Sequence, residues 1–205
     1  MTRSFSWLVL AGVAVLLAAC LPDTRNFLSD RKDAPADTRL LGAWYIAQED
    51  KTIMVHFVPG RTGPMEMVWM ALAPKVAEVD RGPVQWRRYA AWTTKVDGVD
   101  FLNLDLLEPK PQPEGVAMIL RYAITGDGLL TGFMMGPVVS DAIKRGELAG
   151  VVEGTGVVQT AHVTASREAL LDFIRAKGAA AVFSEGLPPF RPLPPTEGNR
   201  PAPHR

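Results

Sequence analysis

The sequence predicts a mainly β fold, in which seven or eight antiparallel strands form a small up-and-down barrel and one or two short helices pack against it near the C-terminal part. Two observations predict this class. Short apolar runs follow one another through the middle of the chain, and Gly, Pro and Asp residues separate them. A closed barrel removes exposed strand edges, so we favour it over an open sheet, with a sandwich as the alternative.

The apolar runs and their separators give the positions of the strands. We expect strands near residues 40–48, 52–58, 65–73, 84–95, 100–107, 116–125 and 129–135, and a short strand near 157–163. The dipeptides Asp97-Gly98 and Asp127-Gly128 suit turn positions with positive φ, so each predicts a hairpin between its flanking strands.

Two helices are expected late in the chain. The first covers 137–145, because it begins with a proline and is followed by Gly146. The second covers 167–177, with Ser166 as its N-terminal cap and Gly178 at its C-terminal end. Its apolar stripe predicts that it covers one end or wall of the barrel. This stripe consists of Leu170, Leu171, Phe173 and Ile174.

Residues 1–19 have the parts of a secretory signal, with a basic Arg3, an apolar run over 7–17 and small residues before a cleavage site. The run is shorter than the roughly twenty apolar residues of a spanning helix. The segment Leu17-Ala18-Ala19-Cys20 resembles the lipobox of bacterial lipoproteins. This resemblance implies that the leader is removed and that Cys20 carries the lipid. An ordinary signal peptide with an incidental cysteine is the alternative.

Cysteine usage agrees with the lipobox interpretation. Cys20 is the only cysteine, so without lipidation an exported protein would carry a thiol with no disulfide partner. The resemblance implies a protein of the cell envelope that is attached to a membrane by lipid and faces the periplasm. Leu21, rather than Asp, follows the cysteine, which in enteric bacteria implies the outer membrane rather than the inner one.

The composition divides the rest of the chain into three parts. Residues 20–38 combine prolines and charges without a regular period, so we expect a lipid anchor followed by a flexible tether. Residues 39–186 form the β-barrel domain with its late helices. Residues 187–205 are rich in proline, which predicts a disordered tail, with recognition of this tail by a partner as the alternative.

The start of the predicted domain carries a second family resemblance. Gly42-Ala43-Trp44 resembles the G-x-W signature at the start of lipocalin-like barrels. The resemblance implies that Trp44 packs across the closed end of the barrel. Residues 38–186 are also similar to uncharacterised bacterial lipoproteins with one small β-domain, which implies no known activity.

Barrels of this size can hold an apolar ligand between their inward side chains. One face of 65–73 and one face of 84–95 are rich in Met and Trp, which suit hydrophobic ligands, although such residues can equally fill a solid interior. An arginine on such a face could bind a ligand carboxylate or phosphate, or stack on tryptophan at the rim. The candidate ligand contacts are Met67, Trp69, Trp86, Arg88, Trp92 and Arg121.

Enzymatic and nucleic-acid functions have little support in the sequence. It contains no G-x-S-x-G, no Gly-rich phosphate loop and no H-E-x-x-H motif. His56, His162 and His204 are far apart, and the acidic residues between 97 and 108 suit turns and strand edges, so we expect no metal, no cofactor and no enzymatic activity. The 22 basic and 22 acidic residues balance, which gives nucleic acid no electrostatic attraction.

We therefore expect a membrane-anchored lipoprotein whose β-domain binds a hydrophobic or amphipathic molecule, or an envelope protein. The alternative is a structural or assembly accessory of the envelope whose barrel is filled. A hydrolase or isomerase would need a cavity in which His56 or the acidic residues of 97–108 meet a nucleophile. A pocket of a few hundred Å³ distinguishes the ligand-binding hypothesis from the filled barrel.

Overall fold

The fold is mainly β, as predicted. The computed structural model describes residues 22–47, 52–61, 63–72, 84–108, 117–155, 158–184 and 187–193. Within these ranges no helix is long and apolar enough to span a membrane. Cys20, the predicted leader over residues 1–19 and residues 194–205 lie outside the described residues.

The described residues form eleven strands, three α-helices and one 3₁₀ turn. The strands are β1 (Asp23–Thr24), β2 (Gly42–Ala47), β3 (Thr52–Pro59), β4 (Met65–Leu72), β5 (Val84–Val96), β6 (Val99–Glu108), β7 (Ala117–Thr125), β8 (Gly128–Phe133), β9 (Gly150–Thr155), β10 (Val158–Val163) and β11 (Arg191–Pro192). The helical segments are η1 (Thr38–Leu40), α2 (Gly136–Lys144), α3 (Arg167–Lys177) and α4 (Ala179–Val182). The eight predicted strands correspond to β2–β8 and β10, within two residues at each end.

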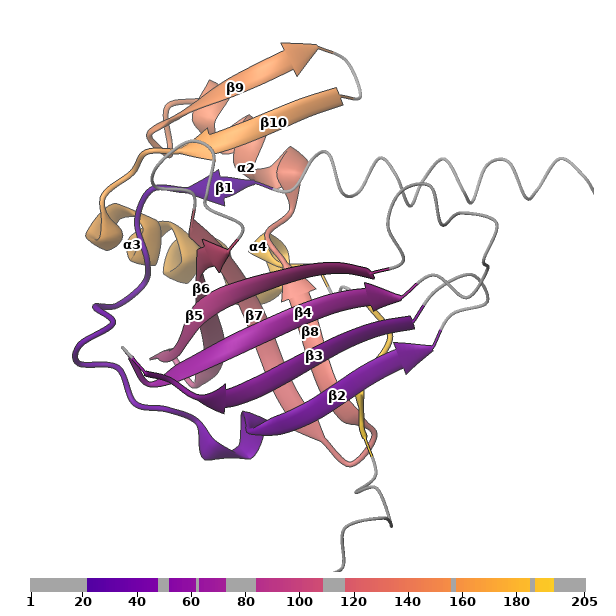
Figure 1. Ribbon diagram of the computed structural model, residues 1–205. Coiled ribbons are helices and arrows are strands. Elements are labelled where there is room, and N and C mark those ends of the chain that lie inside the picture. The colour runs from indigo at the N-terminus through magenta and orange to yellow at the C-terminus, as the bar shows by residue number, and fades with distance from the viewer. Residues whose placement is uncertain are drawn as a thin grey trace, which may run out of the picture.

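Strands β2 to β8 form an antiparallel meander in chain order (Figure 1). Both predicted hairpins are present, and residues with positive φ lie in the first turn and directly after the second. Asp97 and Gly98 have φ values of 48° and 82°, and Gly128 has a φ of 133°. A left-handed backbone is unfavourable for most side chains, so these residues specify where β5 turns into β6 and β7 into β8.

The sheet is not the closed barrel of seven or eight strands that the sequence predicts. Its eleven strands follow the order β11-β2-β3-β4-β5-β6-β7-β1-β10-β9, and β8 pairs with β7 beside this path. The path stays open because β7 shares its second edge between two partners. Its first residue, Ala117, pairs with Thr24 of β1, whereas residues 120–125 pair with β8.

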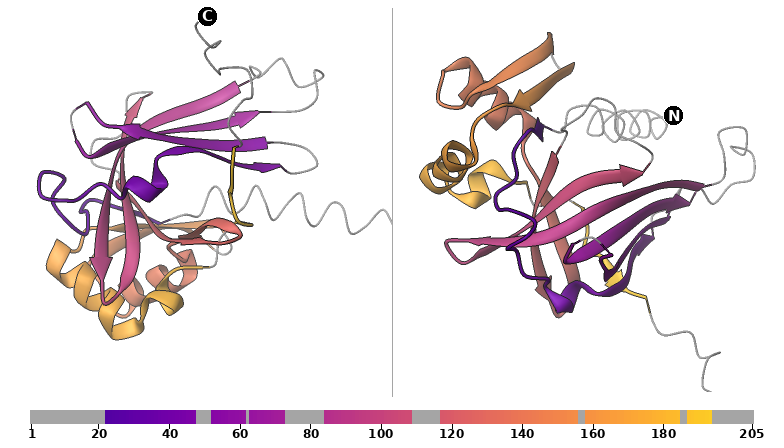
Figure 2. Two further views of the ribbon diagram at one scale, coloured as in Figure 1. Left: turned by 90° about the horizontal axis from the view of Figure 1, so that it is seen from below. Right: turned by 60° about the vertical axis from the view of Figure 1, so that its left-hand side comes forward.

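The segment 187–193 lies between β8 and β2. Phe190 exchanges two backbone hydrogen bonds of 2.9 Å with Leu129 of β8, and β11 pairs with Trp44 and Tyr45 of β2. In Figure 2 this yellow segment connects the two sides of the meander. The predicted disorder of the tail is therefore wrong for 187–193, because the prolines tolerate an extended conformation and Phe190 is buried.

The N-terminal strap, as we call residues 22–38, is packed rather than flexible. The Leu28 side chain is 2% exposed, and its backbone N–H donates to the Asn103 side chain at 2.9 Å. The Asn26 amide donates to the carbonyl of Ala165 at 2.8 Å. The predicted tether is therefore wrong for residues 22–38. An extended segment needs no regular period to bury single side chains, so composition did not reveal the packing.

Alternate residues of the meander point to two opposite faces. The inner face carries the inner cluster, whose buried members are Leu40, Trp44, Ile46, Ile53, Val55, Phe57, Met65, Met67, Tyr89, Ala91, Leu102, Leu104, Leu120, Tyr122, Leu129 and Phe190. In β3, for example, Ile53, Val55 and Phe57 are buried while His56 is exposed. This alternation follows from the two-residue period of a strand.

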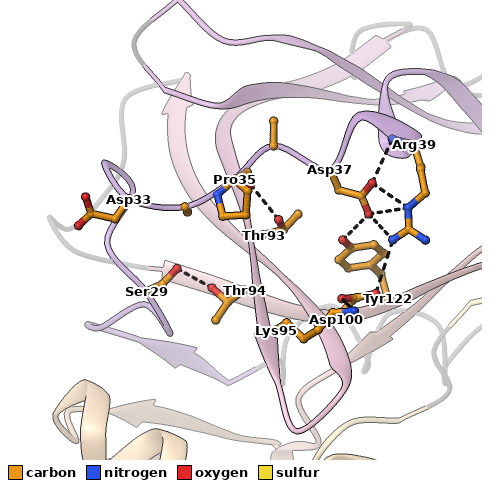
Figure 3. A pocket seen from close by; sticks show the side chains of 12 residues that line it. Ser29, Asp33, Pro35, Asp37, Arg39, Thr93, Thr94, Lys95, Asp100 and Tyr122 are labelled. Carbon is orange, nitrogen blue, oxygen red and sulfur yellow. Dashed lines mark hydrogen bonds and ion pairs between the residues drawn. The ribbon is translucent and has the colours of Figure 1, made fainter.

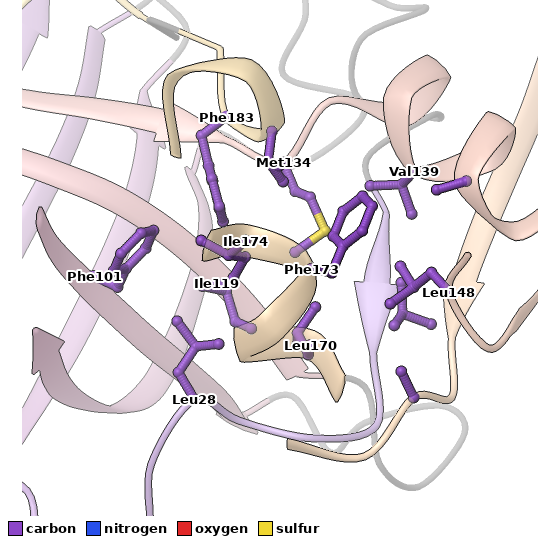
Figure 4. Packing of buried hydrophobic residues seen from close by; sticks show 14 of the residues in the cluster. Leu28, Phe101, Ile119, Met134, Val139, Leu148, Leu170, Phe173, Ile174 and Phe183 are labelled. Carbon is purple, nitrogen blue, oxygen red and sulfur yellow. The ribbon is translucent and has the colours of Figure 1, made fainter. Parts of the chain in front are cut away.

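The outer face of β6 and β7 is covered by the C-terminal helices (Figure 4). Phe101 of β6 and Ile119 of β7 belong to an outer cluster with α3, α4 and the strap. The other labelled members in Figure 4 are Leu28, Met134, Val139, Leu148, Leu170, Phe173, Ile174 and Phe183. Helix α3 has its predicted bounds, since the Ser166 hydroxyl accepts a hydrogen bond from the Ala169 N–H and Gly178 follows the last turn.

Candidate ligand-binding cavity

The inner face of the meander encloses a cavity of about 360 Å³. Apart from Arg87 and Thr131, its lining side chains are aliphatic or aromatic. Strands β3, β4 and β6 supply much of the wall through Ile53, Val55, Phe57, Met67, Leu102 and Leu104. Leu40 of η1 and Phe190 of the C-terminal segment complete it. A space of this size and chemistry suits the apolar part of one small ligand.

Two of the predicted ligand contacts lie in this wall. Met67 and Trp69 occupy alternate positions of β4 and both line the cavity, as their shared face predicts. Met67 is buried and Trp69 is half-buried. Their contact with a ligand stays a prediction.

The predicted face of β5 is the wrong one. Tyr89 and Arg87 line the cavity, so Trp86, Arg88 and Trp92 point away from it. The more apolar face of β5, with Trp86 and Trp92, is the outer one, so apolar content favoured the wrong face.

The three misassigned residues have separate roles on the outer face. Trp92 is 1% exposed, donates to the Ser29 carbonyl at 3.2 Å and contacts the Phe27 ring edge-on, with centroids 4.4 Å apart. Trp86 is 48% exposed. Arg88 lies 3.8 Å from the Glu66 carboxylate. The outer face of β5 is thus apolar because the strap covers part of it.

Arg121 also lies outside the cavity. It occupies the outer face of β7, between Phe101 of β6 and Gly132 of β8. There it borders a hollow of about 120 Å³ beside Ser184. Ile119, which shares this face of β7, belongs to the outer cluster.

Gly42 and Trp44 of the G-x-W segment have structural roles at the start of β2. Gly42 adopts a φ of 118°, which only glycine accommodates readily. Trp44 is buried in the inner cluster, and its indole N–H donates to the Leu40 carbonyl at 2.8 Å. Because Leu40 lines the cavity, this hydrogen bond positions η1 against the cavity wall.

A second, polar cleft of about 360 Å³ lies between the strap and the β5–β6 hairpin (Figure 3). At its centre the Asp37 carboxylate accepts hydrogen bonds from Arg39 at 2.6 Å and from the Tyr122 hydroxyl at 2.9 Å. Lys95 lies 3.1 Å from the Asp100 carboxylate, which also lies 3.6 Å from Arg39. Two of the three carboxylates that line the cleft, Asp37 and Asp100, are therefore paired with its two cations.

The same contacts determine the protonation of the cleft. The Arg39 guanidinium and then the Tyr122 hydroxyl lower the pKa of Asp37 to about 2. Burial, followed by the Asp37 carboxylate, raises the pKa of Tyr122 well above its usual range. At neutral pH an ionised Asp37 and a neutral Tyr122 thus form a stable pair, which attaches the strap to β7.

No protein-family model matches the chain, and neither a curated protein nor a solved structure matches it. The cavity and the N-terminal sequence are therefore the features of the protein that bear on its function.

The part of the chain that the structure describes contains no group of three His, Cys, Asp or Glu residues placed to hold a metal ion. His162 lies 2.8 Å from Asp23 and 3.7 Å from Glu153, but these are two separate pairs on its ring nitrogens. His56 is exposed on β3. The cavity wall includes none of these residues.

Sequence reasoning missed Arg87 and the Asp37–Tyr122 pair. Arg87 lies opposite Trp69 in the β4–β5 register, so knowledge of that register would have placed it beside a predicted lining residue. Asp37 had no comparable signal, because its partner Tyr122 is distant in sequence and its own segment was expected to be flexible.

Proposed function

We propose that this protein is a non-enzymatic, lipid-anchored component of the bacterial cell envelope whose β-domain binds a hydrophobic or amphipathic molecule in the inner cavity. The single observation that supports ligand binding is the cavity of about 360 Å³ in the middle of the inner cluster. It falls within the range of about 300–1,000 Å³ that is typical of small-molecule pockets. The lipobox-like segment ending at Cys20 supports the anchor.

We further infer a lipocalin-like arrangement of the β2–β8 meander around its ligand. The bridge between Leu129 and Phe190, followed by β11 on β2, places a chain segment across the gap between β8 and β2. A filled interior, as a purely structural accessory would have, is not favoured because the cavity lies where its packing would be densest.

Lipid extraction tests ligand binding. We expect that the protein purified from a bacterial host retains a small apolar molecule, which mass spectrometry detects after extraction with organic solvent. Leu104→Phe should reduce the retained amount, because the larger side chain occupies space in the cavity. Trp86→Ala is the control, since Trp86 lies outside the cavity and is exposed. Equal retention by the two variants would count against the cavity as the site.

Replacement of the cysteine tests the anchor. We expect Cys20→Ala to abolish labelling with an alkyne analogue of palmitate and to leave the protein unprocessed or soluble. Leu21→Asp is a matched variant, which should keep the label but move the protein from the outer to the inner membrane in an enteric host. Membrane attachment of Cys20→Ala at the level of the unmodified protein would contradict the proposal.

A further inference from the structure

We propose that the ligand of the inner cavity is an anionic amphiphile with a single chain, and that Arg87 binds its charged group at the cavity opening. This inference rests on the proposed function and specifies the class of ligand. It derives from the exposure of the lining residues, the free guanidinium of Arg87 and the lack of a site for charge inside the cavity.

Exposure identifies the opening of the cavity. Arg87 is the one exposed side chain among the described residues that line it, and the others are buried or half-buried. Trp69, directly opposite Arg87 in the β4–β5 register, is half-buried. The cavity therefore meets solvent beside Arg87 and Trp69, and a ligand that enters there passes the guanidinium.

The Arg87 guanidinium is available to a ligand. In the described part of the chain it has neither an ion pair nor a hydrogen bond, whereas three other arginines hold carboxylates at short distance. Arg39 binds Asp37 at 2.6 Å, and Arg145 and Arg167 each lie 2.7 Å from a carboxylate. An arginine at the edge of an apolar cavity can bind a carboxylate or phosphate through two parallel hydrogen bonds.

The interior offers no place for the charged end of an amphiphile. The Tyr122 hydroxyl donates to Asp37 in the polar cleft, so the phenol is engaged outside the cavity. Thr131 and Tyr89 contribute neutral hydroxyls and Trp69 a neutral indole N–H, and the other inner side chains are apolar. Burial of an unpaired charge is strongly unfavourable. The chain of the ligand therefore lies inside the cavity, and its anionic group stays at Arg87.

Calorimetric titration with four ten-carbon probes tests this inference. The protein is residues 20–205 with Cys20→Ala, which retains every described contact and needs no detergent. We expect decanoate and decyl phosphate to bind at least about tenfold more tightly than methyl decanoate and decan-1-ol. Arg87→Gln should remove this difference by weakening only the anions. Tighter binding of decanoate than of decyl phosphate would indicate a carboxylate ligand, and the reverse would indicate a phosphate. Either result supports the inference.

Two further variants provide controls. Arg25→Gln removes an equal charge from an exposed arginine whose described contact is a backbone hydrogen bond, so all four affinities should be unchanged. Arg87→Lys retains the charge without the paired donors and should keep part of the preference for anions. If Arg87→Gln does not fold, the unmodified protein still tests the inference, because its preference for anions should weaken as salt concentration rises.

The outcomes separate the inference from the proposed function. Equal affinity for the anions and the neutral probes, or an equal loss for all four in Arg87→Gln, would overturn the role of Arg87 while ligand binding stands. Failure of every probe to bind at millimolar concentration would instead refute the cavity as a binding site.

Discussion

The two faces of the β-sheet differ in how completely they are packed. On the outer face, Trp92 lies under the strap with an edge-on contact to Phe27, and the helices cover Phe101. On the inner face, equally apolar side chains surround a cavity. The covered outer face can supply stability, while the inner face leaves the space that the proposed ligand would occupy.

Two tryptophans on the outer face of β5 provide the strongest test of this difference. We expect Trp92→Ala to lower the free energy of unfolding by about 3–5 kcal/mol, because it removes a fully buried indole. Trp86→Ala should change it by less than about 0.5 kcal/mol, since that side chain is largely exposed. Urea denaturation measures both. Similar losses would show that the strap does not stabilise the outer face.

Two glycines with positive φ test the bridge that borders the inner face. A Cβ on Gly128 would collide with the carbonyl oxygen of Phe190, whereas a Cβ on Gly98 would meet no atom within 4 Å. We expect Gly98→Ala to cost about 1 kcal/mol, from backbone conformation alone. Gly128→Ala should cost at least about 2 kcal/mol, because it also displaces Phe190. Equal melting temperatures of the two variants in thermal denaturation would argue against a stabilising bridge between Leu129 and Phe190.

The cleft that attaches the strap predicts a smaller effect. We expect Tyr122→Phe to lower the free energy of unfolding by about 1–2 kcal/mol, because Asp37 loses a hydrogen bond to its charged form. Denaturation measured at neutral pH tests this value. An unchanged stability would show that the pair does not hold the strap.

The same cleft predicts how stability depends on pH. The pKa of Asp37 is lowered by folding, so its contribution is complete above the ordinary value of 3.8 and disappears as the pH falls from 3.8 to about 2. Asp37→Asn should be less stable at neutral pH and should lack this part of the acid dependence. A parallel acid dependence in Asp37→Asn and the unmodified protein would contradict the role of this carboxylate.

The smallest predicted effect concerns the inner face. The Thr131 side chain is 9% exposed, and its hydroxyl oxygen has no hydrogen-bond partner among the described residues. Thr131→Val should raise the free energy of unfolding by about 1 kcal/mol, because it removes a buried polar group without a partner and keeps the shape. A lower stability in denaturant titration would show that this hydroxyl is hydrogen-bonded in solution.

The strands and helix α3 could be predicted because their signals are local. Asp97-Gly98 forms its turn, and Ser166 caps its helix, from neighbouring residues alone. Burial on β5 could not be predicted in this way. Trp86 and Trp92 share a face and a residue type, yet only Trp92 is covered by the distant strap. The open sheet has the same kind of cause, since β1 takes part of the edge of β7.

The packed start of the strap affects how the protein would sit on a membrane. Pro22 is buried and β1 begins at Asp23, so a lipid on Cys20 would be two residues, or at most about 7 Å of extended chain, from the folded domain. So short a connection leaves the domain little freedom to tumble above the bilayer. The side of the molecule with β1 would face the lipid headgroups, and the Arg87 opening would keep a constant height and direction relative to them.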